Sequence, residues 1–256
     1  MSGPVAIVTG ASRGIGRATA IRLAQDFAGV VIVARTAETL QEAAAKIKER
    51  GAEPLALDLD LREPSSADAV VKGALDRFGR IDALVNIAGA VPQTDLLAMS
   101  DAEWNDGLSL KFHGARRLTL RAWEALKSAR GAVVLTSGAT ALAPKAALAA
   151  VATINAAITA LAKAFSERGI ADGVQVNSVL PGRVMTDRRR TMLSKYAAAN
   201  GLSLDAAMQR FATEAGISRY GAPEEIADLM AFLVSPAARW MTGAAVRMDG
   251  GEATAI

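Results

Sequence analysis

The chain has 256 residues, of which 51% are hydrophobic and 21% charged, so it can bury a sizeable core and is not a disordered protein. Its 29 Lys and Arg exceed its 26 Asp and Glu by only three, which argues against a nucleic-acid-binding chain. There is no cysteine and one histidine, His113, so disulfides, thiolate catalysis, metal sites and a Ser-His-Asp triad are not expected.

No apolar run reaches the length of a membrane span, and the first ten residues run directly into a strand pattern rather than a signal peptide. We therefore expect a cytoplasmic protein that binds no membrane and holds no metal.

Short runs rich in Val, Ile and Leu alternate with longer helical patterns along the chain. Seven runs are mostly apolar on both faces, as parallel strands covered by helices require. They are residues 5–9, 30–34, 54–57, 81–86, 132–136, 174–179 and 245–248. Between the fifth and sixth runs, apolar residues from Leu148 to Phe165 recur every three or four positions, which indicates a helix. This alternation predicts an α/β fold: a doubly wound, Rossmann-type parallel sheet of seven strands with helices on both faces, forming a single domain over residues 1–256.

The longest stretch without a strand signal is residues 186–221, which we predict to be a substrate loop or lid. It is polar, contains the consecutive arginines Arg188, Arg189 and Arg190, and then becomes helical. These arginines, with Arg183, could attract an acidic substrate such as a carboxylate, a coenzyme A thioester or an acyl carrier. A solvated helix face is an equal alternative.

A glycine-rich turn follows the first strand and precedes a helix. Gly10 permits the tight turn, Gly14 lets the backbone approach a diphosphate, and Gly16 lets the helix pack closely on the strand. The free N–H groups at the start of the helix would then face the phosphates. A tight turn alone has the same spacing, but its position after the first strand favours dinucleotide binding.

The spacing of this loop, together with later motifs, resembles the short-chain dehydrogenase/reductase family over essentially the whole chain. The later motifs are Asn86-Ile87-Ala88-Gly89, the Pro181-Gly182 segment that ends in Thr186, and Asp249-Gly250-Gly251. The resemblance implies an oxidoreductase with a nicotinamide dinucleotide cofactor. The cofactor contacts that it implies are Gly10, Ser12, Arg13, Gly14, Ile15, Gly16, Arg35, Asp58, Leu59, Asn86, Ala88, Gly89, Pro181, Gly182, Val184 and Thr186.

Two details of the cofactor site are open to alternatives. Asp58 occupies the position where the family contacts the adenine, but a loop carboxylate that caps a helix would look the same, and Asp60 competes for the role. At the end of the second strand, Ala34 stands where NAD-specific proteins carry an acid, and Arg35 follows it. Because Arg35 and Arg13 can pair with a 2′-phosphate, we expect NADP(H) rather than NAD(H).

The catalytic residues of the family are all changed. The serine falls on Gly138, the tyrosine on Val151, the lysine on Asn155 and the asparagine on Lys111. No neighbouring residue restores them: Ser137 is one position early and would face the other side of its strand, and the two tyrosines lie far downstream. The usual mechanism of the family therefore does not carry over.

Lysine and asparagine have exchanged positions, which suggests that the Lys111 ammonium reaches the space next to Asn155. There it would hold the nicotinamide ribose or donate a proton; the alternative is that Lys111 faces water or another subunit. Thr140 could supply the lost hydroxyl and Tyr196 the lost acid, but a loop threonine and lid packing are the favoured interpretations.

Two functions remain compatible with the sequence. The first is an NADP(H)-dependent oxidoreductase that acts on a small carbonyl or alcohol, including an acidic one, through a non-standard active site. The second is a catalytically inactive dinucleotide-binding sensor or partner subunit. The resemblance also implies a homotetramer or homodimer, with which the alanine-rich stretch 143–164 is compatible.

Overall fold

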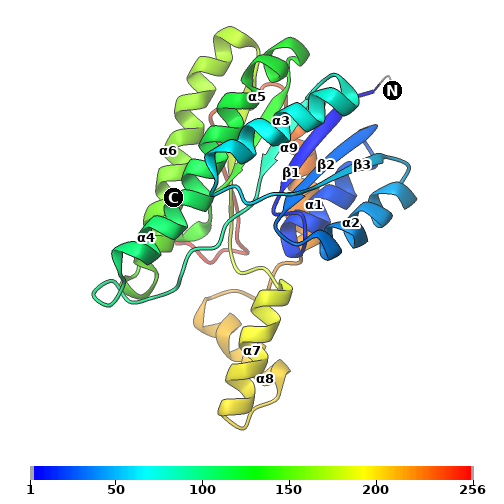
Figure 1. Ribbon diagram of the computed structural model, residues 1–256. Coiled ribbons are helices and arrows are strands. Elements are labelled where there is room, and N and C mark those ends of the chain that lie inside the picture. Colours follow the sequence, from blue (N-terminus) through cyan, green and yellow to red (C-terminus); the bar gives the residue numbers. More distant parts are fainter. Residues whose placement is uncertain (1–2, 255–256) are drawn as a thin grey trace.

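The computed structural model describes residues 3–254. Their centre is one parallel sheet in the order β3-β2-β1-β4-β5-β6-β7 (Figure 1). The strands are β1 (Val5–Thr9), β2 (Gly29–Ala34), β3 (Glu53–Asp58), β4 (Ala83–Asn86), β5 (Ala132–Thr136), β6 (Gln175–Pro181) and β7 (Ala245–Met248). This confirms the predicted seven-stranded sheet, and only the ends of β2, β3, β4 and β6 differ from the prediction, by one or two residues. The strand order reverses between β1 and β4, where the carboxyl ends of strands form a crevice.

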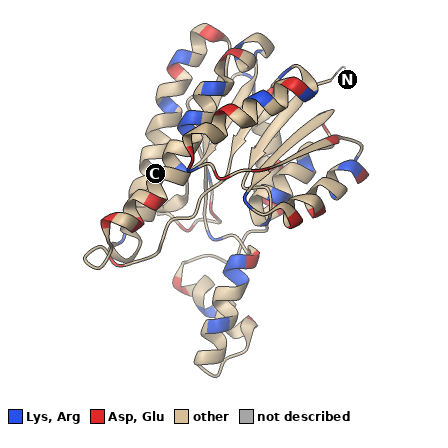
Figure 2. Cartoon of the chain, in the orientation of Figure 1, with Lys and Arg blue, Asp and Glu red and all other residues tan. Residues whose placement is uncertain are grey.

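Helices cover both faces of the sheet (Figure 1). One face carries α1 (Gly14–Leu23), α2 (Ala37–Glu49) and α9 (Pro223–Val234). The other carries α3 (Pro64–Phe78), α5 (Ala115–Ala129) and α6 (Ala149–Asp172). Apolar residues on alternate sides of the strands make two cores, for example Ile7 toward α3 and α5 and Val8 toward α1 and α9. Charged side chains lie mostly on helices and loops (Figure 2), as the burial of both sheet faces requires.

One helical stretch changes its winding beside the sheet. Helix α4 (Asp101–Gly107) continues without a break into a π-helix, η1 (Leu108–Gly114), and then into α5. The start of α4 is fixed by a capping box in which Ser100 and Glu103 exchange hydrogen bonds. Short π-helical turns inside α-helices are common at functional sites, and this one contains Lys111.

The predicted lid segment forms an arm that projects from the body of the molecule (Figure 1). It consists of α7 (Asp187–Ala199) and α8 (Leu204–Glu214), which pack around a small core of their own. That core contains Leu193, Ala212, Ile217 and Tyr220. The chain enters and leaves the arm side by side, at a bridge between Val184 and Gly221.

Helix α6 corrects one sequence expectation. With the turn before it, Ala146–Asp172 is long and apolar enough to cross a membrane, with a mean hydropathy of 1.6. The predicted helix from Leu148 to Phe165 is thus longer in the structure than its apolar pattern indicated. The helix packs against β5 and β6, and Ile158 and Ala162 belong to the core. In this fold its apolar composition serves to cover a sheet.

Candidate active site

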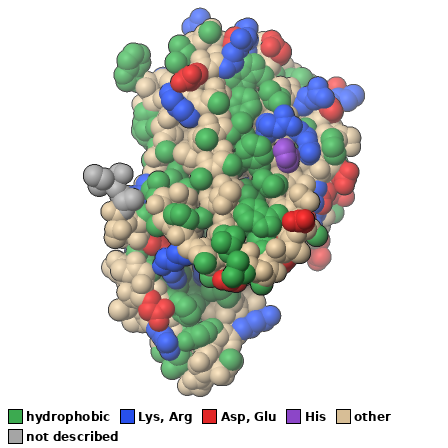
Figure 3. Space-filling model, turned by 90° about the vertical axis from the view of Figure 1, so that its left-hand side faces the viewer, with side chains coloured by type: hydrophobic (Ala, Val, Ile, Leu, Met, Phe, Trp, Pro, Cys, Tyr) green, Lys and Arg blue, Asp and Glu red, His purple; other side chains and the backbone are tan. Residues whose placement is uncertain are grey.

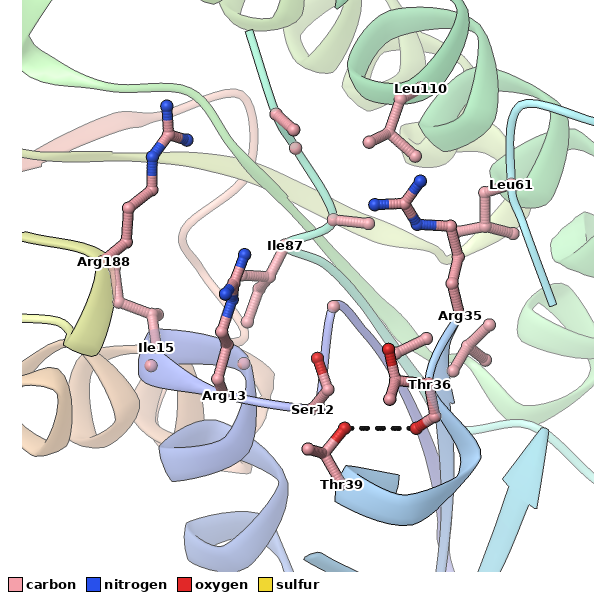
Figure 4. A pocket seen from close by; sticks show the side chains of 18 of the residues that line it. Ser12, Arg13, Ile15, Arg35, Thr36, Thr39, Leu61, Ile87, Leu110 and Arg188 are labelled. Carbon is pink, nitrogen blue, oxygen red and sulfur yellow. Dashed lines mark hydrogen bonds between the residues drawn. The ribbon is translucent and has the colours of Figure 1, made fainter. Parts of the chain in front are cut away.

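A cavity of about 400 Å³ lies at the carboxyl ends of β1, β2 and β4 (Figure 4). It is bounded by the loop between β1 and α1, by the start of α2 and by the start of α7. Eleven of the predicted cofactor residues line it, which brings segments far apart in the sequence to one place. They are Gly10, Ser12, Arg13, Gly14, Ile15, Gly16, Arg35, Leu59, Ala88, Gly89 and Thr186.

The floor of the cavity is the glycine loop, and its geometry requires glycine. Gly10 and Gly14 have φ values of 68° and 54°, which side chains rarely adopt. A β-carbon on Gly16 would overlap the carbonyl oxygen of Gly10, and one on Gly14 would come within 3.2 Å of Thr186. The first turn of α1 carries no acidic residue, so its free N–H groups and positive dipole end are open to an anion. This cradle fits the diphosphate of a dinucleotide.

Three guanidinium groups point into the same cavity, with Arg13 between Arg35 and Arg188 in Figure 4. Arg35 lies 3.7 Å from a carboxylate oxygen of Asp60. Within residues 3–254, neither Arg13 nor Arg188 forms an ion pair. Two carboxylates, Asp60 and Asp187, also line the cavity. Its three guanidinium groups outnumber them by one.

The structure does not bring five of the predicted cofactor residues to the cavity wall. Asp58 is exposed at the end of β3, whereas Asp60 lines the cavity. Asn86 is buried and donates a hydrogen bond to Thr119 (3.3 Å). The remaining three, Pro181, Gly182 and Val184, lie where β6 joins α7, behind the wall.

Several lining residues were not predicted from the sequence. Thr36 and Thr39 begin α2 beside Arg35, and the Thr39 hydroxyl donates to the Thr36 carbonyl (3.1 Å). The two threonines that follow Arg35 at the end of the second strand could have been predicted from the sequence as additional cavity residues. The others are Val33, Leu61, Ala90, Leu110 and Asp187. Four further lining residues, Ala34, Asp60, Ile87 and Arg188, had been considered from the sequence without being predicted as cofactor contacts.

Lys111 lies directly behind the cavity wall. A β-carbon on Gly89 would come within 3.0 Å of Lys111 Cδ, so the lysine stem packs against the lining segment. The Lys111 ammonium donates to the Ser137 carbonyl oxygen (3.0 Å) and to Asn155 Oδ1. Burial of the ammonium lowers the pKa of Lys111 to about 8. The exchanged lysine and asparagine are thus direct partners.

Asn155 joins Lys111 to the loop after β5. Its Nδ2 donates to Thr140 Oγ1 (2.8 Å), and its side chain occupies the space above Gly138. A β-carbon at position 138 would lie 2.6 Å from Nδ2. Ser137 points the other way, toward α6, where its hydroxyl donates to the Asn155 backbone carbonyl (2.7 Å). The absence of a serine at position 138 and the presence of asparagine at 155 are therefore sterically linked.

The remaining candidate residues lie in apolar surroundings or away from Lys111. Val151, at the position of the family's tyrosine, packs in an apolar cluster with Val91 and Ile154. Tyr196 packs edge-on against Phe211 in the arm, with ring centroids 4.9 Å apart. Across residues 3–254, no group of three or more acidic or histidine side chains could hold a metal ion.

Comparison with known proteins supports one family. A sequence profile described as enoyl-(acyl carrier protein) reductase matches residues 10–252. The chain is 33% identical to the short-chain reductase protein NovJ of Streptomyces niveus (97% of this chain, 93% of that one). It is 32% identical to a 3-oxoacyl-[acyl-carrier-protein] reductase of Vibrio cholerae (98% of each chain).

A solved structure agrees with these relatives. L-sorbose reductase from Gluconobacter frateurii, complexed with NADPH and L-sorbose, superposes with a TM-score of 0.96 at 31% identity, over 100% of this chain and 98% of that one. Sequence and structure thus match over nearly the full length of both chains. The chain belongs to the short-chain dehydrogenase/reductase family of oxidoreductases.

Proposed function

We propose that this protein is an NADP(H)-dependent oxidoreductase that reduces the carbonyl group of a small molecule, with Lys111 as the proton donor. The observation that carries the proposal is the position of the Lys111 ammonium, held behind the cavity wall by Asn155 and the Ser137 carbonyl. The ammonium replaces an acid that the family normally draws from a tyrosine.

The ammonium has the donor capacity and the acidity for this task. It carries three N–H donors, and two are used by protein acceptors within the described residues. A third remains for a ligand oxygen. A pKa of about 8 lies near neutral pH, where a general acid works efficiently.

The reaction balances with these groups. A dinucleotide held by the loop of Gly10, Gly14 and Gly16 would supply the hydride that the carbonyl carbon accepts. Lys111 gives one proton to the carbonyl oxygen, becomes a neutral amine, and regains a proton from solvent before the next turnover. In the reverse direction the neutral amine would accept the proton of the alcohol.

The preference for NADP(H) rests on the charges in the cavity. Arg35 and Arg13 line the cavity together with Ser12, Thr36 and Thr39, and in this proposal the two guanidinium groups hold the 2′-phosphate. The similar L-sorbose reductase was solved with NADPH. An arginine fork pairs with a phosphate through two hydrogen bonds, which a ribose hydroxyl cannot offer.

The test begins with a fluorescence titration of NADPH and NADH, which needs no substrate. NADPH oxidation is then followed with L-sorbose, a 3-oxoacyl thioester and a panel of ketones. We expect Lys111→Met to lose at least about 100-fold in kcat, while Lys163→Met, at an exposed lysine on α6, changes little. Unchanged turnover in Lys111→Met would refute the proposal.

One observation favours the second candidate, a cofactor-binding protein without catalysis. Val151 fills the position of the family's tyrosine with an apolar side chain in an apolar cluster. Tight NADPH binding without turnover over the whole panel would select this function.

We propose further that this enzyme acts on an acidic substrate and that it forms a homo-oligomer. The Arg188 guanidinium, which has no ion-pair partner in residues 3–254, supports an acidic substrate; 4-oxopentanoate should then be reduced faster than its methyl ester. Figure 3 looks onto the side of α4, α5 and α6 and shows hydrophobic side chains gathered there. Leu120 on α5 and Ile170 on α6 are 50% and 71% exposed. Light scattering should give the mass of a dimer or tetramer.

A further inference from the structure

The side-chain amide of Asn155 has a defined orientation. Its oxygen must face Lys111, because an ammonium can only donate hydrogen bonds. Its Nδ2 must therefore face Thr140, to which it donates a hydrogen bond of 2.8 Å. The buried position of Asn155, 3% exposed, leaves little freedom to rotate.

This orientation decides what Thr140 can do. The oxygen of its hydroxyl accepts the hydrogen bond from Asn155, so its own hydrogen points elsewhere. Among the described residues, that hydrogen has no acceptor. Ser137 and Thr159 differ, because each hydroxyl donates to a protein oxygen: Ser137 to the Asn155 carbonyl (2.7 Å) and Thr159 to Ser137 Oγ (3.0 Å).

Thr140 also lies in a suitable place. It belongs to the short 3₁₀ turn η2 (Ala139–Ala141) and lies four residues beyond the end of β5 at Thr136, on the side of the sheet where α/β proteins bind their ligands. It is partly buried, whereas Ser137 is almost fully buried. A serine at position 138 would place its β-carbon 2.6 Å from Asn155 Nδ2. Glycine stands there instead, so the hydroxyl that this loop offers to a ligand is that of Thr140.

We propose that Thr140 is a catalytic residue whose hydroxyl donates a hydrogen bond to the substrate carbonyl oxygen, and that Asn155 is the positioning residue that aims it. This inference rests on the proposed reductase function. The chain Lys111–Asn155–Thr140 places two free donors, an ammonium N–H and a hydroxyl, at its two ends. A donor that meets the developing negative charge on oxygen is worth about 100- to 1,000-fold in kcat.

The first experiment measures kcat, KM and the NADPH dissociation constant for Thr140→Val, Thr140→Ser and the control Thr159→Val, with the best carbonyl substrate of the panel. Thr140→Val should lose about 100-fold in kcat, Thr140→Ser should retain activity within about threefold, and NADPH binding should not change. Thr159→Val removes a hydroxyl of the same cluster and should stay within about threefold.

A second variant tests the role of Asn155. Asn155→Asp keeps the shape but replaces the Nδ2 donor by an acceptor, so Thr140 would donate to the carboxylate and not to the substrate. We expect a loss similar to that of Thr140→Val, little further loss in the double variant, and a pH profile displaced upward because a carboxylate raises the pKa of Lys111.

The outcomes separate the two proposals. If the wild-type protein reduces no carbonyl, the reductase function falls and this inference with it. If the wild type is active and Thr140→Val matches it in kcat, or Thr140→Ser is as impaired as Thr140→Val, only the role of Thr140 is refuted.

Discussion

Gly138→Ala tests the steric link between position 138 and Asn155. Backbone strain plays no part, because the φ of Gly138 is 170°, an extended value that alanine adopts. The new β-carbon would lie 2.6 Å from Asn155 Nδ2, well inside van der Waals contact. Asn155 cannot retreat without losing its bond to Lys111 or to Thr140.

The expected cost follows from two opposing effects. Overpacking of this kind costs about 1–3 kcal/mol. Replacing glycine by alanine regains about 0.4–1 kcal/mol by restricting the unfolded chain. The middle of each range leaves a net loss of about 1.3 kcal/mol, which lowers Tm by about 3–5 °C in a chain of this size.

Thermal unfolding followed by circular dichroism measures this loss, with two comparisons. Gly73→Ala, on helix α3, places its β-carbon at an ordinary 3.4 Å from Leu57 Cδ1 and should not lower Tm. In an Asn155→Ala background, Gly138→Ala should no longer destabilise, because the obstructing amide is gone. An equal Tm for Gly138→Ala and wild type, or an equal drop in both backgrounds, would refute the steric argument.

Three further predictions follow from charged groups. The rate of carbonyl reduction should fall as pH rises through about 8, because Lys111 then loses the proton it donates; a pH–rate profile checks this. Because the pKa of Lys111 is lowered by folding, the unfolded chain binds more protons than the folded chain between about pH 8 and pH 10.5. The urea midpoint of the wild type should therefore rise with pH over this window, and the midpoint of Lys111→Met should not show this rise. Arg35→Ala should weaken NADPH binding about 10- to 100-fold and NADH binding little, and equal losses for both cofactors would show that Arg35 does not meet the 2′-phosphate.

The sheet was predictable because its five inner strands, β1, β2, β4, β5 and β6, are buried on both faces. Every residue of β1 is buried, and a strand covered by helices on both faces requires mostly apolar side chains. The glycine loop was predictable for a similar reason, since Gly10, Gly14 and Gly16 each meet a steric demand that no other residue satisfies.

The catalytic arrangement was predictable only in part. The reciprocal exchange of Lys111 and Asn155 suggested that the two side chains meet, and the structure places them in contact. The orientation of the Asn155 amide, and with it the free hydroxyl of Thr140, depends on three segments brought together by the fold. The π-helical turn that carries Lys111 has no periodic signal, because one wide turn does not alter the spacing of its neighbours enough to be recognised.

The arm has a consequence for how this protein can change. Its two ends meet at the Val184–Gly221 bridge, where Met185 N–H donates to the Gly221 carbonyl (2.8 Å) and Gly221 N–H to the Arg183 carbonyl (2.9 Å). The entropy of closing a loop between adjacent ends depends only weakly on the length of the loop. The helices between these two ends can therefore change in length or sequence without a large loss of stability. Insertions, deletions or grafts from relatives can diversify what covers the cavity, while the sheet and the glycine loop keep their geometry.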